Sequence, residues 1–248
     1  MKTSVQQLRE ERDLPEQFVA ALSHDLRTPV AAAKIGAQVL GKKSNEPEAV
    51  RRLASLISDC VDRADQMIGD LLDANRVSAG GKLALRIEPC VLNDLAAHTV
   101  EELKTLLGDH FIVRASASIE GWWSATALSR ILENLCNNAI KYWDAEAPVT
   151  ISLSLEGEVV QMAVHNEGPP IPPADVATLF EQHRRTAGAR ASGKPGWGLG
   201  LALVRGLAES HRGSVRMPST AEEGTTFWVS LPRDARPPTD QVRIYVQS

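Results

Sequence analysis

The 248-residue sequence predicts a multidomain protein, in which an all-α antiparallel helical hairpin precedes an α+β domain with a mixed sheet. Three observations carry this prediction. Helical apolar spacing runs through the first part of the chain, Ala79-Gly80-Gly81 interrupts it, and alternating strand and helix patterns follow. We therefore expect domains over residues 1–79 and 82–233, and a C-terminal tail over residues 234–248.

The first domain is predicted to be two long helices joined by a polar turn. Between Leu53 and Ala74, apolar residues recur in steps of three and four, which is the seam of a coiled coil or a bundle. A polar stretch over residues 42–46 comes before this helix, and Pro47 suits its first turn. Because the apolar stripe is wider than one hairpin can bury, we expect a homodimer that closes a four-helix bundle. The alternative is a hairpin packed only on its own C-terminal domain.

The second domain is predicted to be a sheet with helices on one face. Strands are expected where apolar residues alternate, and helices where they recur with a period near 3.6. The expected strands cover residues 83–87, 111–115, 149–155, 159–164, 214–217 and 226–231. The expected helices cover residues 91–107, 125–141, 173–181 and 199–211.

The composition of the chain argues against several classes of binding partner. A net charge of −4 leaves no basic footprint for nucleic acid or an anionic membrane. No apolar run approaches the roughly 18–20 residues that span a bilayer, and the start lacks a signal-peptide core. We therefore expect a cytoplasmic protein with no membrane segment in this chain. Cys60, Cys90 and Cys136 lack metal-site spacing and are expected to be buried small apolar residues.

The candidate chemistry begins at His24-Asp25-Leu26-Arg27-Thr28-Pro29, within a helical pattern. A neutral imidazole nitrogen can attack a phosphoryl group, and an adjacent carboxylate can hold the ring tautomer and accept the proton. His24 is therefore the candidate nucleophile and Asp25 its base. Thr28 lies three residues after Asp25, where both side chains can address one water. The alternative is an ordinary His–Asp pair on a solvated helix face.

Two downstream segments predict a nucleotide site. Asn134, Asn138 and Lys141 share one helical stripe, where amide oxygens suit Mg²⁺ and an ammonium group suits phosphates. An amide-rich helix cap is the alternative there. The glycine-rich residues 193–200 open an apolar helix whose first N–H groups can bind phosphate oxygens. Rossmann and P-loop interpretations fit this segment poorly, because the strand context and the Lys-Ser/Thr pair are missing.

Together these motifs resemble the transmitter core of two-component sensor histidine kinases. In that family a dimerisation and phosphotransfer hairpin precedes a Bergerat-type (GHKL) ATP-binding domain. The matching segments are the phosphoacceptor box at residues 24–29, the asparagine box at 134–141, the phenylalanine box at Leu179-Phe180-Glu181, the second glycine box at 196–201 and the final glycine-threonine turn at 224–227.

The resemblance implies an ATP-dependent protein-histidine kinase that phosphorylates its own His24. The phosphoryl group would then pass to an aspartate in the receiver domain of a response regulator, and Asp25 and Thr28 would also act in dephosphorylating that regulator. ATP and Mg²⁺ are the implied cofactors, with Asn134 and Asn138 as metal ligands. The implied nucleotide-binding residues are Asn134, Asn138, Lys141, Tyr142, Asn166, Gly168, Arg185, Gly196, Gly198, Leu199, Gly200 and Thr225.

One motif departs from the family pattern. These kinases commonly carry Asp-x-Gly-x-Gly, whereas this chain has Asn166-Glu167-Gly168-Pro169-Pro170. An asparagine still accepts a hydrogen bond from the adenine amino group, but without charge assistance, so we expect weaker ATP binding. A non-catalytic dimeric phosphotransfer scaffold with a degenerate pocket is therefore the alternative function. A Bergerat-type ATPase is a third, which Asn134 disfavours because an amide cannot take a proton from water.

Overall fold

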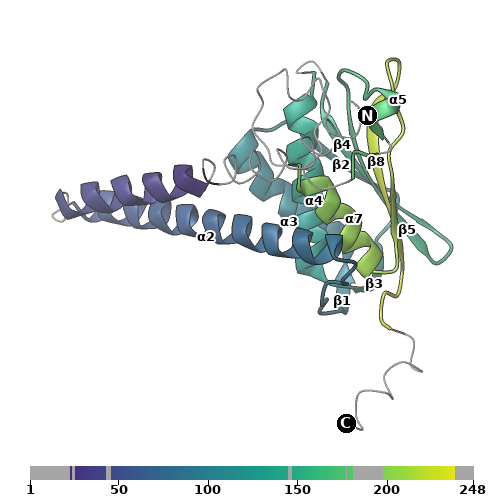
Figure 1. Ribbon diagram of the computed structural model, residues 1–248, viewed down its shortest axis with the longest axis horizontal. Helices are drawn as coiled ribbons and strands as arrows, with labels where there is room; N and C mark the ends of the chain where they lie inside the picture. Colours follow the sequence, from purple (N-terminus) through teal and green to yellow (C-terminus); the bar gives the residue numbers. More distant parts are fainter. Residues whose placement is uncertain are drawn as a thin grey trace, which may run out of the picture.

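The computed structural model describes residues 23, 26–42, 46–144, 147–176, 178–180 and 198–237. Figure 1 shows a long helical hairpin that extends to one side of an α/β sandwich. Helices α4 (Ala125–Tyr142) and α7 (Gly200–Ser210) lie between the C-terminal part of α2 (Pro47–Ser78) and the sheet. In the described part of the chain, no helix combines the length and apolar content that crossing a bilayer requires.

The predicted hairpin is confirmed. Residues 26–42 form a helix that returns along α2, and Pro47 occupies the first turn of α2. The two helices approach closely at Gly36, where an added Cβ would lie 3.0 Å from Cγ1 of Ile57. The helix α2 ends at the predicted break, and Gly80 follows with a φ of 76°, which glycine adopts without strain. Large apolar side chains remain exposed along the hairpin, namely Val30, Ile35, Leu56, Val61, Ile68 and Leu72.

The second domain is built on one mixed sheet with a small separate pair of strands. The sheet order is β2 (Phe111–Ala115), β4 (Val149–Glu156), β5 (Val159–Asn166), β8 (Gly224–Pro232) and β6 (Ser214–Arg216). Only the β2–β4 pairing on this path is parallel, and β7 (Ser219–Thr220) pairs with the start of β8. The antiparallel pair consists of β1 (Glu88–Val91) and β3 (Glu120–Trp123).

Helices α3 (Leu92–Leu107), α4 and α7 pack on one face of this sheet, and the short α5 (Pro173–Val176) follows β5. In β4, buried and half-buried residues alternate, so only one face of the strand enters the core. Buried residues of α4 recur at helical spacing and meet that face. This packing fixes α4 and α7 beside the ends of β5 and β8.

The structure corrects several predictions. Residues 83–87 form no strand; the strand begins at Glu88, because its partner is β3, which the sequence analysis did not predict. The predicted helix over 173–181 ends at Val176, and residues 178–180 form a turn. Cys136 is buried as expected, but Cys60 and Cys90 are only half-buried.

Candidate functional site

The asparagine stripe lies on the part of α4 that faces away from the sheet. Asn134 donates from Nδ2 to the carbonyl oxygen of Arg130 at 2.8 Å, which turns Oδ1 away from its own helix. A Cβ added to Gly200 would lie 2.6 Å from this Oδ1, so the oxygen faces the first residue of α7, and a larger residue there would displace the amide. Asn138 is half-buried one turn further along α4, and its amide contacts no other described side chain through a hydrogen bond. Two amide groups are thus available beside the start of α7.

The start of α7 offers main-chain donors to an anion. Leu199 is buried at the N-cap position, where no described side chain caps the helix. Gly198 precedes it with a φ of 69°, a conformation that favours glycine. The first N–H groups of a helix have no partner within the helix and attract negative charge. Phosphate oxygens at this helix start would therefore lie next to Oδ1 of Asn134.

A second group of predicted residues meets where β5 and β8 adjoin the end of α4. Asn166, at the end of β5, is buried and lies opposite Thr225 in β8. Asn166 donates from Nδ2 to the carbonyl oxygen of Glu167 at 3.3 Å, which leaves Oδ1 as an acceptor. An added Cβ on Gly168 would collide with the carbonyl oxygen of Tyr142, so glycine allows this close approach. These residues can border the base of a nucleotide.

Lys141 and the hydroxyl groups of Ser219 in β7 and Thr225 in β8 belong to this part of the candidate site. The ammonium nitrogen of Lys141 lies 5.4 Å from the centroid of the Tyr142 ring. The hydroxyl oxygen of Thr225 is 2.7 Å from that of Ser219, which in turn accepts the main-chain N–H of Ile171 at 2.9 Å. The segment after β5 is therefore held against the start of β8.

Part of the predicted site lies outside the described residues. This applies to His24, Asp25, Arg185 and Gly196. Thr28 is described and lies exposed in the helix over residues 26–42. The structure thus brings together the predicted nucleotide-binding residues of α4, β5, β8 and the start of α7 that it describes.

His211 is a supporting residue that the sequence analysis did not find. Its side chain is fully buried after α7, where Nε2 accepts the main-chain N–H of Ser124 at 3.1 Å and Nδ1 lies 2.8 Å from the carbonyl oxygen of Leu207. The accepting Nε2 places the ring proton on Nδ1. Burial lowers the pKa of His211, against a smaller opposing effect of the Leu207 carbonyl. A neutral imidazole therefore ties the end of α7 to the start of α4.

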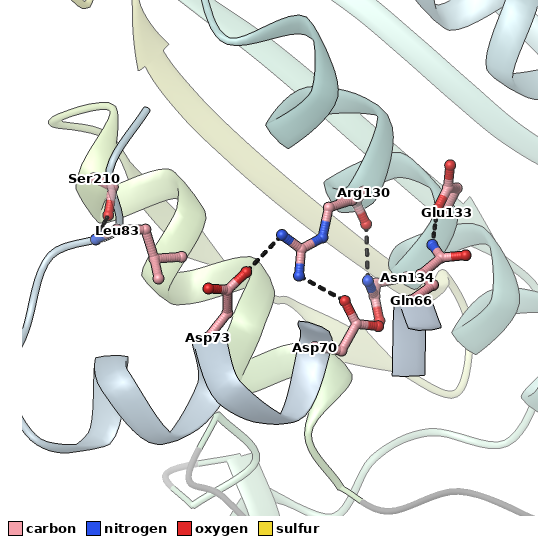
Figure 2. A network of polar contacts seen from close by, with 8 residues as sticks. All are labelled: Gln66, Asp70, Asp73, Leu83, Arg130, Glu133, Asn134 and Ser210. Carbon is pink, nitrogen blue, oxygen red and sulfur yellow. Dashed lines mark hydrogen bonds and ion pairs between the residues drawn. The ribbon is translucent and has the colours of Figure 1, made fainter. Parts of the chain in front are cut away.

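Charged residues also join α4 to α2 (Figure 2), and the motifs did not reveal them. The guanidinium of Arg130 donates from Nη2 to Asp70 and from Nη1 to Asp73, each at 2.6 Å. Gln66 donates to Oε2 of Glu133 at 2.9 Å. Burial raises the pKa of Asp70, although Arg130 opposes this, and burial also raises the pKa of Glu133, although Gln66 opposes this.

A separate depression of about 480 Å³ lies beside the β1–β3 pair. Its lining includes Trp122, Glu158 and Asp234, and none of the predicted site residues. Glu158 lies in the turn directly before β5, whereas Asn166 is the last residue of that strand. The depression is therefore distinct from the candidate nucleotide site.

Two family models match the chain. The model described as "His Kinase A (phospho-acceptor) domain" matches residues 16–80. The model described as "Histidine kinase-, DNA gyrase B-, and HSP90-like ATPase" matches residues 124–235. The first match contains His24, and the second contains the asparagine stripe and α7.

Comparisons with individual proteins over most of this chain agree with these matches. The chain is 31% identical to "Sensor protein KdpD" of Escherichia coli over 94% of its own length and 26% of that protein. It is also 31% identical to "Sensor-like histidine kinase SenX3" of Mycolicibacterium smegmatis, over 87% of its length and 56% of the relative. The chain thus spans from about a quarter to just over half of these relatives.

Solved structures share the fold. A structure described as "ShkA full-length in complex with AMPPNP" has a TM-score of 0.59 and 27% identity, covering 88% of this chain and 46% of that one. The Acinetobacter baumannii histidine kinase AdeS has a TM-score of 0.57 over 85% of this chain and 98% of its own, at 19% identity. At that identity, the second likeness concerns the fold alone.

Proposed function

Because this chain belongs to the two-component sensor histidine kinases, as their transmitter core, we propose that it transfers the γ-phosphoryl group of ATP to His24. From there the group passes to an aspartate in the receiver domain of a response regulator. One observation carries the proposal: Oδ1 of Asn134 faces the start of α7 at Gly200, where no described side chain caps the helix. A metal ligand and a phosphate-binding helix start thereby adjoin in a chain that also carries His24-Asp25.

The nucleotide residues have distinct roles in this proposal. Asn134 and Asn138 hold Mg²⁺, while Lys141 and the first N–H groups of α7 bind phosphate oxygens. When bound there, Mg²⁺ would supply neutralisation of the phosphate charge. Adenine lies against Asn166 and Thr225, whose positions at adjoining strand ends support this role. The complex of ShkA with AMPPNP supports nucleotide binding by this fold.

The residues implied by the resemblance but outside the described part have roles in the same proposal. Arg185 binds phosphate oxygens. Gly196 and the described residues Gly198 and Leu199 allow the main chain to approach the phosphates closely. Tyr142 borders the base, where its carbonyl oxygen meets Gly168. These assignments follow the motif positions in this sequence.

The transfer step uses the phosphoacceptor pair. A neutral ring nitrogen of His24 attacks the γ-phosphorus, the new N–P bond forms as the bond to the β–γ bridging oxygen breaks, and ADP leaves. Asp25 accepts the ring proton. Because the amide of Asn134 cannot take a proton from water, the site favours transfer over ATP hydrolysis. Asp25 and Thr28 then act together on a water in dephosphorylation of the regulator.

The exposed apolar stripe of the hairpin supports a homodimer. Val61, Ile68 and Leu72 are 55%, 44% and 63% exposed along α2, although apolar seams of this kind are normally buried. A second hairpin covers them in a four-helix bundle. A phosphotransfer domain over residues 1–79, an ATP-binding domain over 82–233 and a tail over 234–248 belong to the same proposal.

Labelling with [γ-³²P]ATP and Mg²⁺ tests the proposal. His24→Gln abolishes incorporation and retains ATP binding. His98→Gln is the matched control, because His98 is exposed on α3 and pairs only with Glu102 among the described residues. Undiminished labelling of His24→Gln refutes the assignment.

The scaffold alternative is favoured by Asn166, whose neutral amide replaces the carboxylate of the family motif. An equilibrium titration of the chain with ATP and Mg²⁺ separates the two functions. The kinase binds ATP measurably and labels itself. The absence of both ATP binding and self-labelling supports the scaffold.

A further inference from the structure

The contacts between α2 and α4 set where the nucleotide domain sits on the hairpin. Arg130 lies between two carboxylates of α2, and the side chains of Arg130, Asp70 and Asp73 are 21%, 23% and 30% exposed. Figure 2 shows the guanidinium directed toward both acids, with the pair Gln66–Glu133 one turn away on the same faces. We name Arg130, Asp70 and Asp73 the acid clamp.

The other contacts of α2 with this domain are packed more tightly. An added Cβ on Gly206 of α7 would collide with the side chain of Val77, so the two helices cross at close range. Beyond α2, the main-chain N–H of Leu83 donates to the hydroxyl oxygen of Ser210 at 3.1 Å. The acid clamp is therefore the polar end of an interface whose other end lies next to the break at Gly80.

The acid clamp lies level with the start of the first helix. Gly36 of the first helix faces Ile57 of α2. Because the two helices are antiparallel, the residue ten positions before Gly36, Leu26, lies level with the residue ten positions after Ile57, Met67. At 1.5 Å per residue, Asp70 and Asp73 lie about 5–9 Å further along α2. The proposed phosphoacceptor precedes Leu26 by two positions in the sequence.

The same clamp adjoins the phosphate end of the nucleotide residues. Asn134 follows Arg130 by one turn of α4 and is bonded to its carbonyl oxygen. The amide oxygen of Asn134 faces the start of α7 at Gly200. One turn of helix therefore separates the contact with α2 from the proposed phosphate site.

We propose that Arg130 is a positioning residue for autophosphorylation: the acid clamp docks the nucleotide domain on α2 with its phosphate end level with the start of the phosphoacceptor helix. This inference rests on the proposed function. The clamp is suited to repeated opening, because its groups are partly solvated and Nε of Arg130 is buried with no hydrogen-bond partner among the described residues. A buried donor without a partner is unfavourable, which offsets part of the gain from the two ion pairs.

Arg130→Gln tests the proposal in the full chain. The rate of phosphorylation from pre-bound ATP falls at least tenfold, while the ATP dissociation constant changes less than twofold. Arg114→Gln is the matched control, because Arg114 is exposed on β2. Thermal unfolding followed by circular dichroism checks that each variant folds. An unchanged or faster rate for a folded Arg130→Gln overturns the proposal.

A charge reversal separates positioning from general packing. The triple variant Asp70→Arg, Asp73→Arg and Arg130→Asp restores opposite charges across the same helices, and it recovers most of the rate that Arg130→Asp alone loses. A triple variant as slow as the single one overturns the proposal.

Small-angle X-ray scattering reports docking without reference to chemistry. Arg130→Gln increases the radius of gyration of the chain, and Arg114→Gln leaves it unchanged. An unchanged radius for Arg130→Gln overturns docking by the clamp. If the wild type never labels itself, the proposed function fails, whereas the scattering result still decides docking.

Discussion

Replacing His211 by glutamine tests how the two helices of the nucleotide site are held together. In the wild type, the neutral ring accepts the N–H of Ser124 and donates to the carbonyl oxygen of Leu207. A glutamine oxygen can accept the same N–H, and the carbonyl of Leu207 still receives the main-chain N–H of residue 211 at 3.2 Å. The substitution therefore keeps the helix connection largely satisfied and removes the titratable group.

The sign of the pH effect follows from the direction of the pKa shift. Burial lowers the pKa of His211 from its ordinary value of 6.5, so the unfolded chain takes up the proton first as the pH falls. The full stability is present at pH values well above 6.5 and decreases as the pH falls through and below 6.5. For one proton, the loss between pH 6.5 and pH 5.5 is at most about 1 kcal/mol, or about 2–4 °C in Tm.

Thermal unfolding of both proteins between pH 5.5 and pH 7.5 measures this loss. Other titrating groups are common to both chains and cancel in the difference. The wild type loses up to about 1.4 kcal/mol relative to His211→Gln as the pH falls from 7.5 to 5.5. Parallel pH profiles refute the view that a buried neutral imidazole joins α7 to α4.

Three further substitutions address the nucleotide residues. Gly168→Ala forces a Cβ against the carbonyl oxygen of Tyr142, so it lowers the free energy of unfolding by about 1–3 kcal/mol and weakens ATP binding. Scanning fluorimetry with and without ATP measures both effects, and Gly41→Ala is the control because no atom lies near the added Cβ there. Equal values for the two variants contradict this prediction. Asn166→Asp supplies a charged acceptor and tightens ATP binding by about 1 kcal/mol, roughly fivefold, in a calorimetric titration, whereas GTP binding does not tighten because the carboxylate repels its 6-oxo group; weaker ATP binding argues against adenine at this residue. Gly200→Ala displaces the amide of Asn134 and weakens Mg²⁺-dependent ATP binding, and an unchanged dissociation constant argues against that ligand.

Much of the fold follows from local periodicity. The seam along α2 and the alternation in β4 and β5 each depend on residues a few positions apart, so the sequence predicts them directly. The pair β1–β3 escapes such reasoning, because Glu120–Trp123 is short and does not alternate, and its partner lies far along the chain. The sequence predicts a strand over residues 83–87 because apolar residues alternate there. The residues that pair with β3 come directly after this segment, from Glu88 on.

The candidate site likewise contains residues that local motifs reveal and residues that they do not. Asn134 and Gly200 were found because their motifs carry local spacing, and the structure brings them together. The sequence does not reveal the roles of Arg130 and His211, because their partners lie far along the chain. The acids that bind Arg130 are 57 and 60 residues away, and the N–H that His211 accepts is 87 residues away. An isolated arginine or histidine on a helix has no pattern that distinguishes it from an exposed one. Such connecting residues become visible only when the packing of α2, α4 and α7 is known.

Mapping the phosphoryl group on the chain tests the central claim most directly. After incubation with ATP and Mg²⁺, tandem mass spectrometry of the digested protein under mildly alkaline conditions locates any added group. We expect a single acid-labile phosphoryl group on the imidazole of His24, which disappears when a receiver domain is added. Inorganic phosphate released into solution without modification of His24, or a phosphoryl group on another residue, contradicts the account.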